Sequence, residues 1–300
     1  MTTWLFFAIL APLLWGLPNV IDSILRRHYV KSDLALTWFT ALVRLPVAII
    51  FFLVVGIDIP TPIAIFFMLF GGMLWTLPFI LYYQALKFEE PSKIALLLQL
   101  IPVFILILAF FSLEEVLTIH QGISFFLILI GGFFAALKRK KGSWRFSLAF
   151  WLIILACFLW AVSDVLFKKF EPTFNTFFNA SAFFMLGSAF PALVILSLSK
   201  GRKIITHHFS NLPSRVWGYL TFSVASGISG SLSFAYALTL GKASLTAVIL
   251  GIQPLFTLLF GILLAPFFVE VYREDISKKA LLLKGFSFVL IILGLIYLQF

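Results

Sequence analysis

Apolar residues are grouped in ten blocks of about 20 residues each, and this grouping limits what the chain can fold into more than any other feature. An α-helix needs about 20 apolar residues to cross the ~30 Å hydrocarbon core of a bilayer. Strands do not compete, because an open sheet in lipid would leave the polar groups of its edges without partners. We therefore predict an all-α polytopic membrane protein with ten transmembrane helices, at residues 4–24, 34–56, 63–86, 94–112, 120–137, 147–167, 176–199, 216–239, 244–264 and 281–299.

The composition excludes several classes of protein. Hydrophobic residues make up 62% of the chain and charged residues 11%, which is not the composition of a soluble domain. The formal net charge is +10, but the Lys and Arg residues sit in short loops between the blocks. We therefore expect the lipid bilayer, and no nucleic acid, as a partner.

Cys157 is the only cysteine, so no disulfide or Cys/His metal site can form within one chain. The chain has no GxxxxGK[ST] motif, so we expect no bound nucleotide and no other cofactor.

The sequence contains an internal repeat. Residues 11–48 align with residues 156–193 at a constant offset of 145, and residues 85–104 align with residues 237–256 at an offset of 152. Matched tryptophans and prolines carry more weight than matched leucines, because leucine identities are common by chance in apolar sequence. The pairs include Trp15 with Trp160, Asn19 with Asp164, Pro46 with Pro191, Ser92 with Ser244, and Pro102 with Pro254.

The repeat predicts the organisation of the whole chain. We interpret residues 1–142 and 143–300 as two repeats of five helices each. Because five is an odd number, the second repeat must face the opposite way across the membrane. Inverted repeats of this kind are typical of secondary transporters.

Loop charge predicts the orientation, because cytoplasmic loops are enriched in Lys and Arg. Most of the Lys and Arg residues lie in the loops after blocks one, three, five, seven and nine, whereas the opposite loops carry only Lys168, Lys169 and Lys242. We expect the richer side to be cytoplasmic and both termini to be extracytoplasmic, in the plasma or inner membrane. The cations of the richer side are Arg26, Arg27, Lys31, Lys87, Lys93, Lys138, Arg139, Lys140, Lys141, Arg145, Lys200, Arg202, Lys203, Arg215, Arg273, Lys278 and Lys279.

Two stretches resemble the half-repeat of the drug/metabolite transporter superfamily, specifically of its EamA-like families. They are YYQALKFEEPSKIALLLQLIPVFILILAFFSLEEVLTIHQGISFFLILIGGFF at residues 82–134 and FAYALTLGKASLTAVILGIQPLF at residues 234–256. Leu14-Trp15-Gly16 and Arg44-Leu45-Pro46 are similar to the family's first-half pattern. The resemblance implies a ten-helix carrier of small metabolites, with a central cavity lined by spans one, three, four and their second-half counterparts.

Two features depart from the family. Its members usually keep both termini in the cytoplasm, whereas the loop charge of this chain predicts the reverse. The final loop, from Glu270 to Gly285, is longer than its counterpart from Glu115 to Gly122. It is therefore open whether Glu270 or Glu274 matches Glu115.

Polar and aromatic residues inside the blocks are the candidates for solute binding, because polar groups are costly there. We expect binding by Trp15, Asn19, Tyr83, Gln99, Trp160, Asp164, Tyr236 and Gln253. Trp15 and Trp160 lie in the middle of their blocks, which favours a cavity wall over an interfacial belt. For Asp164, a proton carrier or cation ligand and an (i, i+4) pair with Lys168 are equally favoured. For Tyr82 and Tyr83, a belt at headgroup level is at least as well favoured as solute binding.

Other polar residues favour structural roles. Arg44 lies about 15 Å into its block at 1.5 Å per residue. We expect it to be structural or charge-pairing, with Asp22 or Asp164 as partners, although it could also hold a carboxylate or phosphate of the solute. For Asp22, pairing with Arg26 is favoured. Pro102 and Pro254 predict helix kinks, where the amides of Gln99 and Gln253 either satisfy a freed carbonyl or form a polar site.

We conclude from the sequence that the protein is a secondary transporter of a small organic metabolite, such as an amino acid or a similar amphipathic solute. A proton or another coupling ion is compatible with this. One alternative is a polytopic membrane enzyme, since Gly227-Ile228-Ser229-Gly230 resembles the GxSG of intramembrane serine proteases. We do not favour an enzyme, because no histidine follows this motif or lies firmly within a block. The other alternative is a channel or scramblase without alternating access.

Overall fold

A computed structural model describes residues 3–89, 91–136, 139–140, 143–144, 147–210, 212–264 and 278–297. These residues form helices almost throughout, and β1 (Arg139–Lys140) and β2 (Ser143–Trp144) make one short antiparallel pair. The helices of the first half are α1 (Thr3–Ile24), the π-helical turn η1 (Leu25–Tyr29), α2 (Asp33–Leu42), α3 (Arg44–Val55), α4 (Pro62–Thr76), α5 (Pro78–Ala85), α6 (Pro91–Leu97), α7 (Leu100–Leu113) and α8 (Ile119–Ala136).

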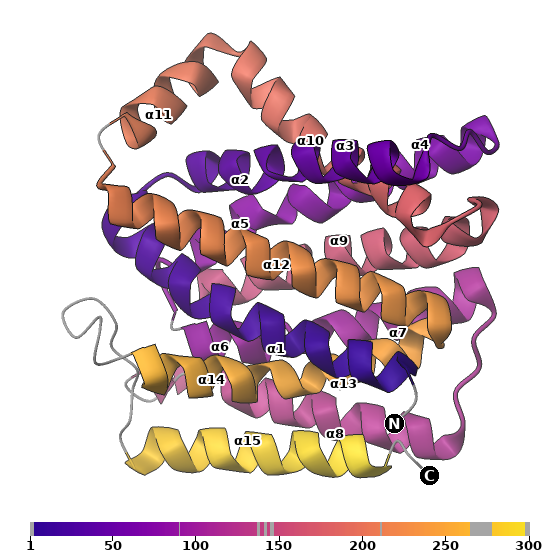
Figure 1. The fold of residues 1–300 in the computed structure, drawn as a ribbon. Helices are drawn as coiled ribbons and strands as arrows, with labels where there is room; N and C mark the ends of the chain where they lie inside the picture. Colours follow the sequence, from indigo (N-terminus) through magenta and orange to yellow (C-terminus); the bar gives the residue numbers. More distant parts are fainter. Residues whose placement is uncertain are drawn as a thin grey trace.

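The second half follows a similar pattern. Its helices are α9 (Leu148–Phe170), the 3₁₀ turn η2 (Glu171–Thr173), α10 (Phe177–Ser197), α11 (Ser199–Phe209), α12 (Ser214–Leu240), α13 (Ala243–Ile249), the 3₁₀ turn η3 (Leu250–Ile252), α14 (Gln253–Leu264) and α15 (Lys278–Tyr297). Helix α11 was not expected, because its polar sequence contains no apolar block. It projects from the bundle at the end where α12 begins (Figure 1).

The prediction of an all-helical membrane protein is confirmed. Six helical segments are long and apolar enough to cross a membrane, and every predicted block contains at least one helix. The six segments are Thr3–Tyr29, Asp33–Val55, Pro62–Ala85, Leu148–Thr173, Phe177–Ser197 and Ala243–Leu264. Ten crossings remain a prediction. Glu270 and Glu274 lie outside the described residues, as do the predicted loop cations Lys138, Lys141, Arg145 and Arg273.

Two helices are interrupted at equivalent positions in the two halves. Helix α6 ends at Leu97 and α7 begins at Leu100, so Pro102 lies in the first turn of α7. In the second half, α13 ends at Ile249 and η3 precedes α14, whose second residue is Pro254. Proline is tolerated in a first turn because its missing N–H would have no partner there.

The two halves interlock rather than lying apart. Helix α1 packs against α12 and α14, whereas α9 packs against α4, α5 and α7, and α10 packs against α3 and α4 (Figure 1). Glycines allow the closest of these approaches. A Cβ atom at Gly72 of α4 would lie 2.0 Å from the carbonyl oxygen of Phe184, and one at Gly187 of α10 would lie 2.1 Å from that of Leu69.

The first and last helices place their outer ends together. The beginning of α1 and the end of α15 lie at the same end of the bundle, opposite to the end that carries α11 (Figure 1). This arrangement requires an even number of passes along the bundle, which agrees with the ten blocks of the sequence.

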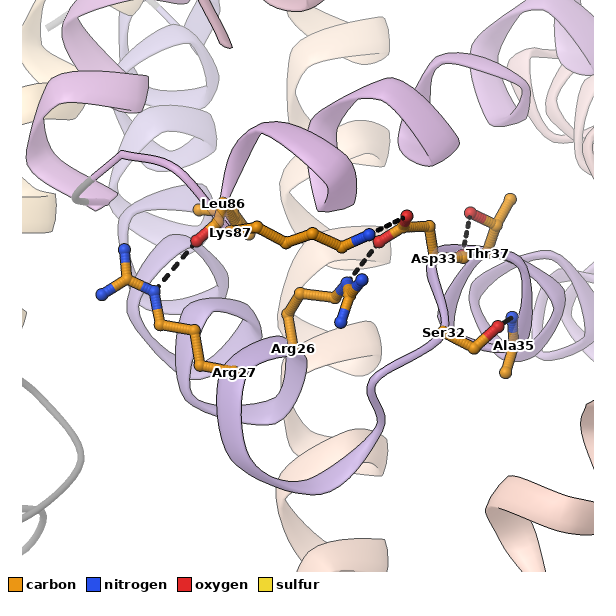
Figure 2. A network of polar contacts seen from close by, with 8 residues as sticks. All are labelled: Arg26, Arg27, Ser32, Asp33, Ala35, Thr37, Leu86 and Lys87. Atoms are coloured by element: carbon orange, nitrogen blue, oxygen red, sulfur yellow. Dashed lines mark hydrogen bonds and ion pairs between the residues drawn. The ribbon is translucent and has the colours of Figure 1, made fainter. Parts of the chain in front are cut away.

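A polar network closes the bundle at the end where α1 meets α2 (Figure 2). The side chain of Arg26 pairs with Asp33 at the start of α2, and Lys87 Nζ lies 2.8 Å from the other oxygen of Asp33. Arg27 Nε donates to the carbonyl oxygen of Leu86 at 2.9 Å, and Arg27 also donates to the carbonyl oxygen of Glu89. The expected pairing of Asp22 with Arg26 is therefore not formed, because Asp33 takes Arg26 instead.

An equivalent contact lies at the opposite end. Lys168 of α9 donates to the carbonyl oxygens of Leu238 and Gly241 at the end of α12. At the repeat offset of 152, these two acceptors are the counterparts of Leu86 and Glu89. The carboxylate of Glu115 then accepts from the backbone N–H groups of Ala243 and Ser244 at 2.8 and 3.0 Å, and so stabilises the start of α13.

Candidate functional site

A large cavity lies where the two halves meet. It encloses about 750 Å³ of empty space, counting the space that is open to solvent. It extends from the middle of α1 toward the end of the bundle where α1 ends. Its lining residues are Trp15, Pro18, Asn19, Asp22, Thr40, Arg44, Trp75, Phe79, Tyr82, Tyr83, Leu98, Ile101, Trp160, Asp164, Ser223, Val224, Gly227, Leu250 and Gln253.

The structure gathers most of the residues that the sequence singled out. Six of the eight proposed solute-binding residues line the large cavity, together with both proposed charge-pairing residues. Gln99 does not line it. Its amide donates to the carbonyl oxygens of Ala95 and, at 3.0 Å, of Leu250, so it bridges the helix interruptions of the two halves. Tyr236 does not line it either, because its ring packs between Phe7 and Phe177.

The two matched tryptophans make reciprocal contacts across the halves. Trp15 Nε1 donates to the carbonyl oxygen of Gly227 at 3.1 Å, and Trp160 Nε1 donates to that of Trp75 at 2.8 Å. The two acceptors are themselves related by the repeat offset of 152, so both partners of each contact obey the repeat. These hydrogen bonds fix the angle at which the two indole rings face the cavity.

Asn19 connects three helices from both halves. Its amide nitrogen donates to Thr257 Oγ1 of α14, and its amide oxygen accepts from the hydroxyl of Tyr82 of α5, each at 3.0 Å. Tyr82 is 3% exposed and Tyr83 is 2% exposed, so neither belongs to an interfacial belt. Tyr83 instead lies 2.9 Å from Thr40 Oγ1. The side chains that face the solute space are thus held by polar contacts of their own.

Three charged residues line the cavity in different states of pairing. Asp22 accepts a hydrogen bond of 2.6 Å from Ser223 Oγ of the opposite half. Arg44 is 1% exposed, and its guanidinium lies 3.9 Å from the ring centre of Trp75. Its only hydrogen bond within the described part of the chain is a 3.5 Å contact with Met185 Sδ, and its Nε has no partner there. Asp164 is 8% exposed and has no hydrogen bond or ion pair among the described residues.

Some lining residues escaped the sequence analysis. Trp75, Phe79, Thr40 and Ser223 all face the large cavity. Helix α4 begins at Pro62 and helix α12 at Ser214, which again differ by the repeat offset, so the repeat could have been extended to them. Extended in this way, the repeat aligns Trp75 with Gly227, and Trp75 would have been identified as a candidate for the cavity wall.

A small cavity adjoins the large one. The two cavities share Trp15, Trp75 and Asp164, and the small one has an empty volume of about 360 Å³. Its lining residues are Trp15, Trp75, Asp164, Phe167, Ser181, Phe184, Met185, Ser231, Leu232, Phe234, Ala235 and Leu238. Among the described residues, no group of three or more His, Cys, Asp and Glu side chains could hold a metal ion.

The comparisons with known proteins agree with this geometry. The model of the EamA-like transporter family matches residues 2–137 and again residues 147–298. The chain belongs to the EamA-like transporter family. The resemblance read from the sequence is therefore confirmed, and the family model matches the chain twice.

A solved structure supports the same fold. It is described only as a crystal structure of a protein, and it matches 99% of this chain and 98% of its own length with a TM-score of 0.69. Its sequence identity of 18% means that the likeness concerns the fold alone. A search of curated proteins finds no match to the chain.

Family membership makes the chain a multi-pass membrane transporter of the drug/metabolite type, since members of this family are transporters. The serine of the protease-like GxSG stretch gives the enzyme alternative no support. Ser229 is exposed on α12 and lines neither cavity.

Proposed function

We propose that this protein is a secondary carrier whose solute is a small zwitterion with an apolar side chain, such as an amino acid. The observation that carries the proposal is that Arg44 and Asp164, two opposite charges in one aromatic cavity, lack the short hydrogen bond that the third charged residue, Asp22, accepts from Ser223. Arg44 and Asp164 both face the large cavity, and neither has a charged partner among the described residues. A buried charge without a partner is costly, so both groups favour a solute that brings the complementary charges.

Each end of such a solute has a specific place. The guanidinium of Arg44 offers a planar set of donors that suits a carboxylate. Asp164 would accept the ammonium group, and Gln253 and Asn19 add neutral polar atoms nearby. The rings of Trp15, Trp160 and Phe79 provide an apolar wall for the side chain.

We infer alternating access from the relation between the two cavities. The repeat offsets map Asp22, Thr40, Tyr82 and Tyr83 of the large cavity onto Phe167, Met185, Phe234 and Ala235, which all line the small cavity. The small cavity therefore corresponds to the large one, in a narrower state at the opposite end. Two inverted repeats, at residues 1–142 and 143–300, would exchange these two states and expose the site to each side in turn.

We further propose that the large cavity faces the cytoplasm. Its lining residues on α1, α5 and α12 lie toward the end of the bundle that carries α11 and the network of Arg26, Arg27 and Lys87 around Asp33 (Figures 1 and 2). Both termini would then be extracytoplasmic, in the plasma or inner membrane. Transport could be coupled to a proton or another ion, or proceed as exchange.

The solute class is tested by thermal unfolding of the purified protein in the presence of single metabolites, because a bound solute raises the apparent stability. We expect apolar amino acids to raise the melting temperature. Matched compounds that lack either the amine or the carboxylate should not. Stabilisation by the amine alone or by the carboxylate alone would contradict the zwitterion.

Transport is tested by counterflow of the stabilising solute in proteoliposomes. We expect saturable exchange that Asp164→Asn reduces by about tenfold or more, as for loss of a charge-assisted contact of ~1.5–3 kcal/mol. Trp160→Ala should also reduce exchange, because it removes part of the cavity wall and the hydrogen bond to Trp75. Full activity of both variants would remove the proposed site. Flux that neither saturates nor responds to solute on the opposite side would favour the channel alternative.

A further inference from the structure

The small cavity contains three oxygen-bearing side chains among otherwise apolar and aromatic walls. They are Asp164 from α9, Ser181 from α10 and Ser231 from α12. Ser231 Oγ donates its proton to the carbonyl oxygen of Gly227 at 2.8 Å, so its lone pairs remain free. Ser181 is 1% exposed, and its hydroxyl has no hydrogen-bond partner among the described residues. A buried hydroxyl without a partner costs free energy, which points to an occupant of the cavity.

The carboxylate of Asp164 likewise has no hydrogen-bond partner among the described residues. Lys168, one turn further along α9, was a possible partner from sequence spacing, but it donates to the carbonyl oxygens of Leu238 and Gly241. Arg44 lines the large cavity together with Asp164, but the two side chains do not form an ion pair. An ionised carboxylate at this depth therefore needs a positive charge from outside the chain.

Comparison of the halves shows that the cluster of Asp164, Ser181 and Ser231 is specific to the second repeat. Asn19, the counterpart of Asp164, is satisfied by Tyr82 and Thr257. At the repeat offset of 152 these two partners correspond to Phe234 and Ile105, which can offer Asp164 no hydrogen bond.

The two serines differ from their counterparts in the same sense. Ser181 corresponds to Leu36 and Ser231 corresponds to Phe79. Thus a carboxylate and two hydroxyls replace an amide and two apolar side chains, and all three changes meet in one small space. The repeat symmetry of the fold does not require these three polar side chains, so their presence together indicates a ligand in the small cavity.

We propose that the small cavity binds one small monovalent metal cation of sodium size. Asp164 supplies the negative charge, and the hydroxyl oxygens of Ser181 and Ser231 are neutral ligands. Hard cations prefer oxygen ligands, and one oxygen of the Asp164 carboxylate can bind the cation while the other accepts the ammonium group of the proposed solute, whose own carboxylate balances that ammonium charge. Because Asp164 also lines the large cavity, the cation lies next to the solute space. Its role as a coupling ion rests on the proposed carrier function, whereas its binding does not.

The test is thermal unfolding of the full-length purified protein without solute, at constant ionic strength and pH, as NaCl replaces choline chloride. We expect the melting temperature to rise and saturate with Na⁺ concentration. Ser181→Ala should require an about tenfold or higher Na⁺ concentration for half of the effect, and Asp164→Asn should abolish it. Ser188→Ala is the matched control, because Ser188 lies on the same helix, donates to the carbonyl oxygen of Phe184 and lines neither cavity.

Three results would overturn the cation site. The first is a wild-type melting temperature that is the same in Na⁺, Li⁺, K⁺ and choline. The second is a full Na⁺ effect in Ser181→Ala, which decides the matter even where Asp164→Asn does not fold. The third is a dependence on pH alone that Asp164→Asn removes, since the carboxyl group would then take only a proton.

A second variant separates this site from the solute site. Arg44→Met should lose solute stabilisation and keep the Na⁺ effect, whereas Ser181→Ala should keep solute stabilisation and need a higher Na⁺ concentration for the Na⁺ effect. Failure of the zwitterion proposal would therefore leave the cation result intact, and failure of the cation proposal would leave the solute result intact.

Discussion

The hydrogen bonds of Trp15 and Trp160 show how single residues hold the cavity in shape. Each indole N–H joins one half of the chain to a backbone carbonyl of the other half, at 3.1 and 2.8 Å. The acceptors are the carbonyl oxygen of Gly227 inside α12 and that of Trp75 in the last turn of α4. Losing the N–H costs one hydrogen bond and leaves the shape of the ring largely intact.

Trp15→Phe and Trp160→Phe should each lower the free energy of unfolding by about 1 kcal/mol and reduce solute exchange. The two effects should be similar in size, because the two contacts are equivalent. Thermal unfolding and counterflow measure them. Trp151→Phe is the control, since Trp151 is 59% exposed on α9. No loss in either cavity variant would show that the indole hydrogen bonds do not hold the site.

Substitution of Arg44 distinguishes a role in solute binding from a role in folding. Its guanidinium is buried without a charged partner among the described residues and rests on the ring of Trp75. Replacing such a group by an apolar side chain of similar length is often neutral or stabilising. We expect Arg44→Met to keep or raise the melting temperature while solute no longer stabilises the protein. Unchanged stabilisation by solute would show that Arg44 only supports the fold.

The sequence predicted most of these side chains but not their partners. Trp15, Trp160 and Asp164 could be selected because polar and large aromatic groups in mid-block are costly or unusual in lipid. Tyr236 met the same criterion, yet it packs between two phenylalanines. A side chain lines the cavity or packs in the core according to which face of its helix meets the other half of the chain. A single apolar sequence does not specify that face.

At the level of helices, close contact between α4 and α10 depends on two glycines that face each other. A Cβ atom at Gly72 would lie 2.0 Å from the carbonyl oxygen of Phe184 and 2.7 Å from the backbone nitrogen of Ser188. Backbone atoms cannot move aside as flexible side chains can. Small residues are the usual means of such approach between transmembrane helices.

Gly72→Ala and Gly187→Ala should therefore force α4 and α10 apart and destabilise the protein by several kcal/mol, of the order of other overpacking changes or more. The expected readout is a lower melting temperature and loss of monodisperse protein in detergent. Gly218→Ala is the control, since a Cβ atom there meets nothing within 4 Å. It should be neutral or stabilising by up to about 1 kcal/mol, because alanine favours helix. Equal stability of all three variants would contradict the packing.

The helix interruptions are another feature that the sequence indicated only in part. Pro102 and Pro254 identify where the helices break, because a proline lacks the N–H that an uninterrupted helix uses. The sequence could not show that Gln99 of one interruption binds the carbonyl oxygen of Leu250 at the other. That contact depends on how the two halves pack together.

At the scale of the molecule, the blocks and the family motifs correctly predicted a helical membrane protein of the two-repeat EamA-like family. Helix α11 was missed because a short polar helix after a span has no apolar block to indicate it. The number of membrane crossings is predicted from the alternation of apolar blocks and loops, and the orientation is predicted from loop charge. Site-specific reporters can measure the number of crossings and the orientation.

We expect single cysteines at Val116 and Lys200 to react with an impermeant reagent from opposite sides of the membrane. Both positions are exposed, the first between α7 and α8 and the second in α11. The background is Cys157→Ser, since Cys157 is the only cysteine and is buried. Lys200→Cys should react from the cytoplasm. Reaction of Lys200→Cys from outside would reverse the orientation, and reaction of both from one side would contradict ten crossings.

The central claim is that one pocket between two equivalent halves opens to each side in turn. The most direct test compares Val224→Cys in the large cavity with Ala235→Cys in the small cavity, in the Cys157→Ser background. Proteoliposomes of known orientation are treated with an impermeant thiol reagent from each side. We predict that Val224→Cys reacts from the side that carries α11 and that Ala235→Cys reacts from the other side. Reaction of both cysteines from the same side, or of either one equally from both sides, would contradict alternating access.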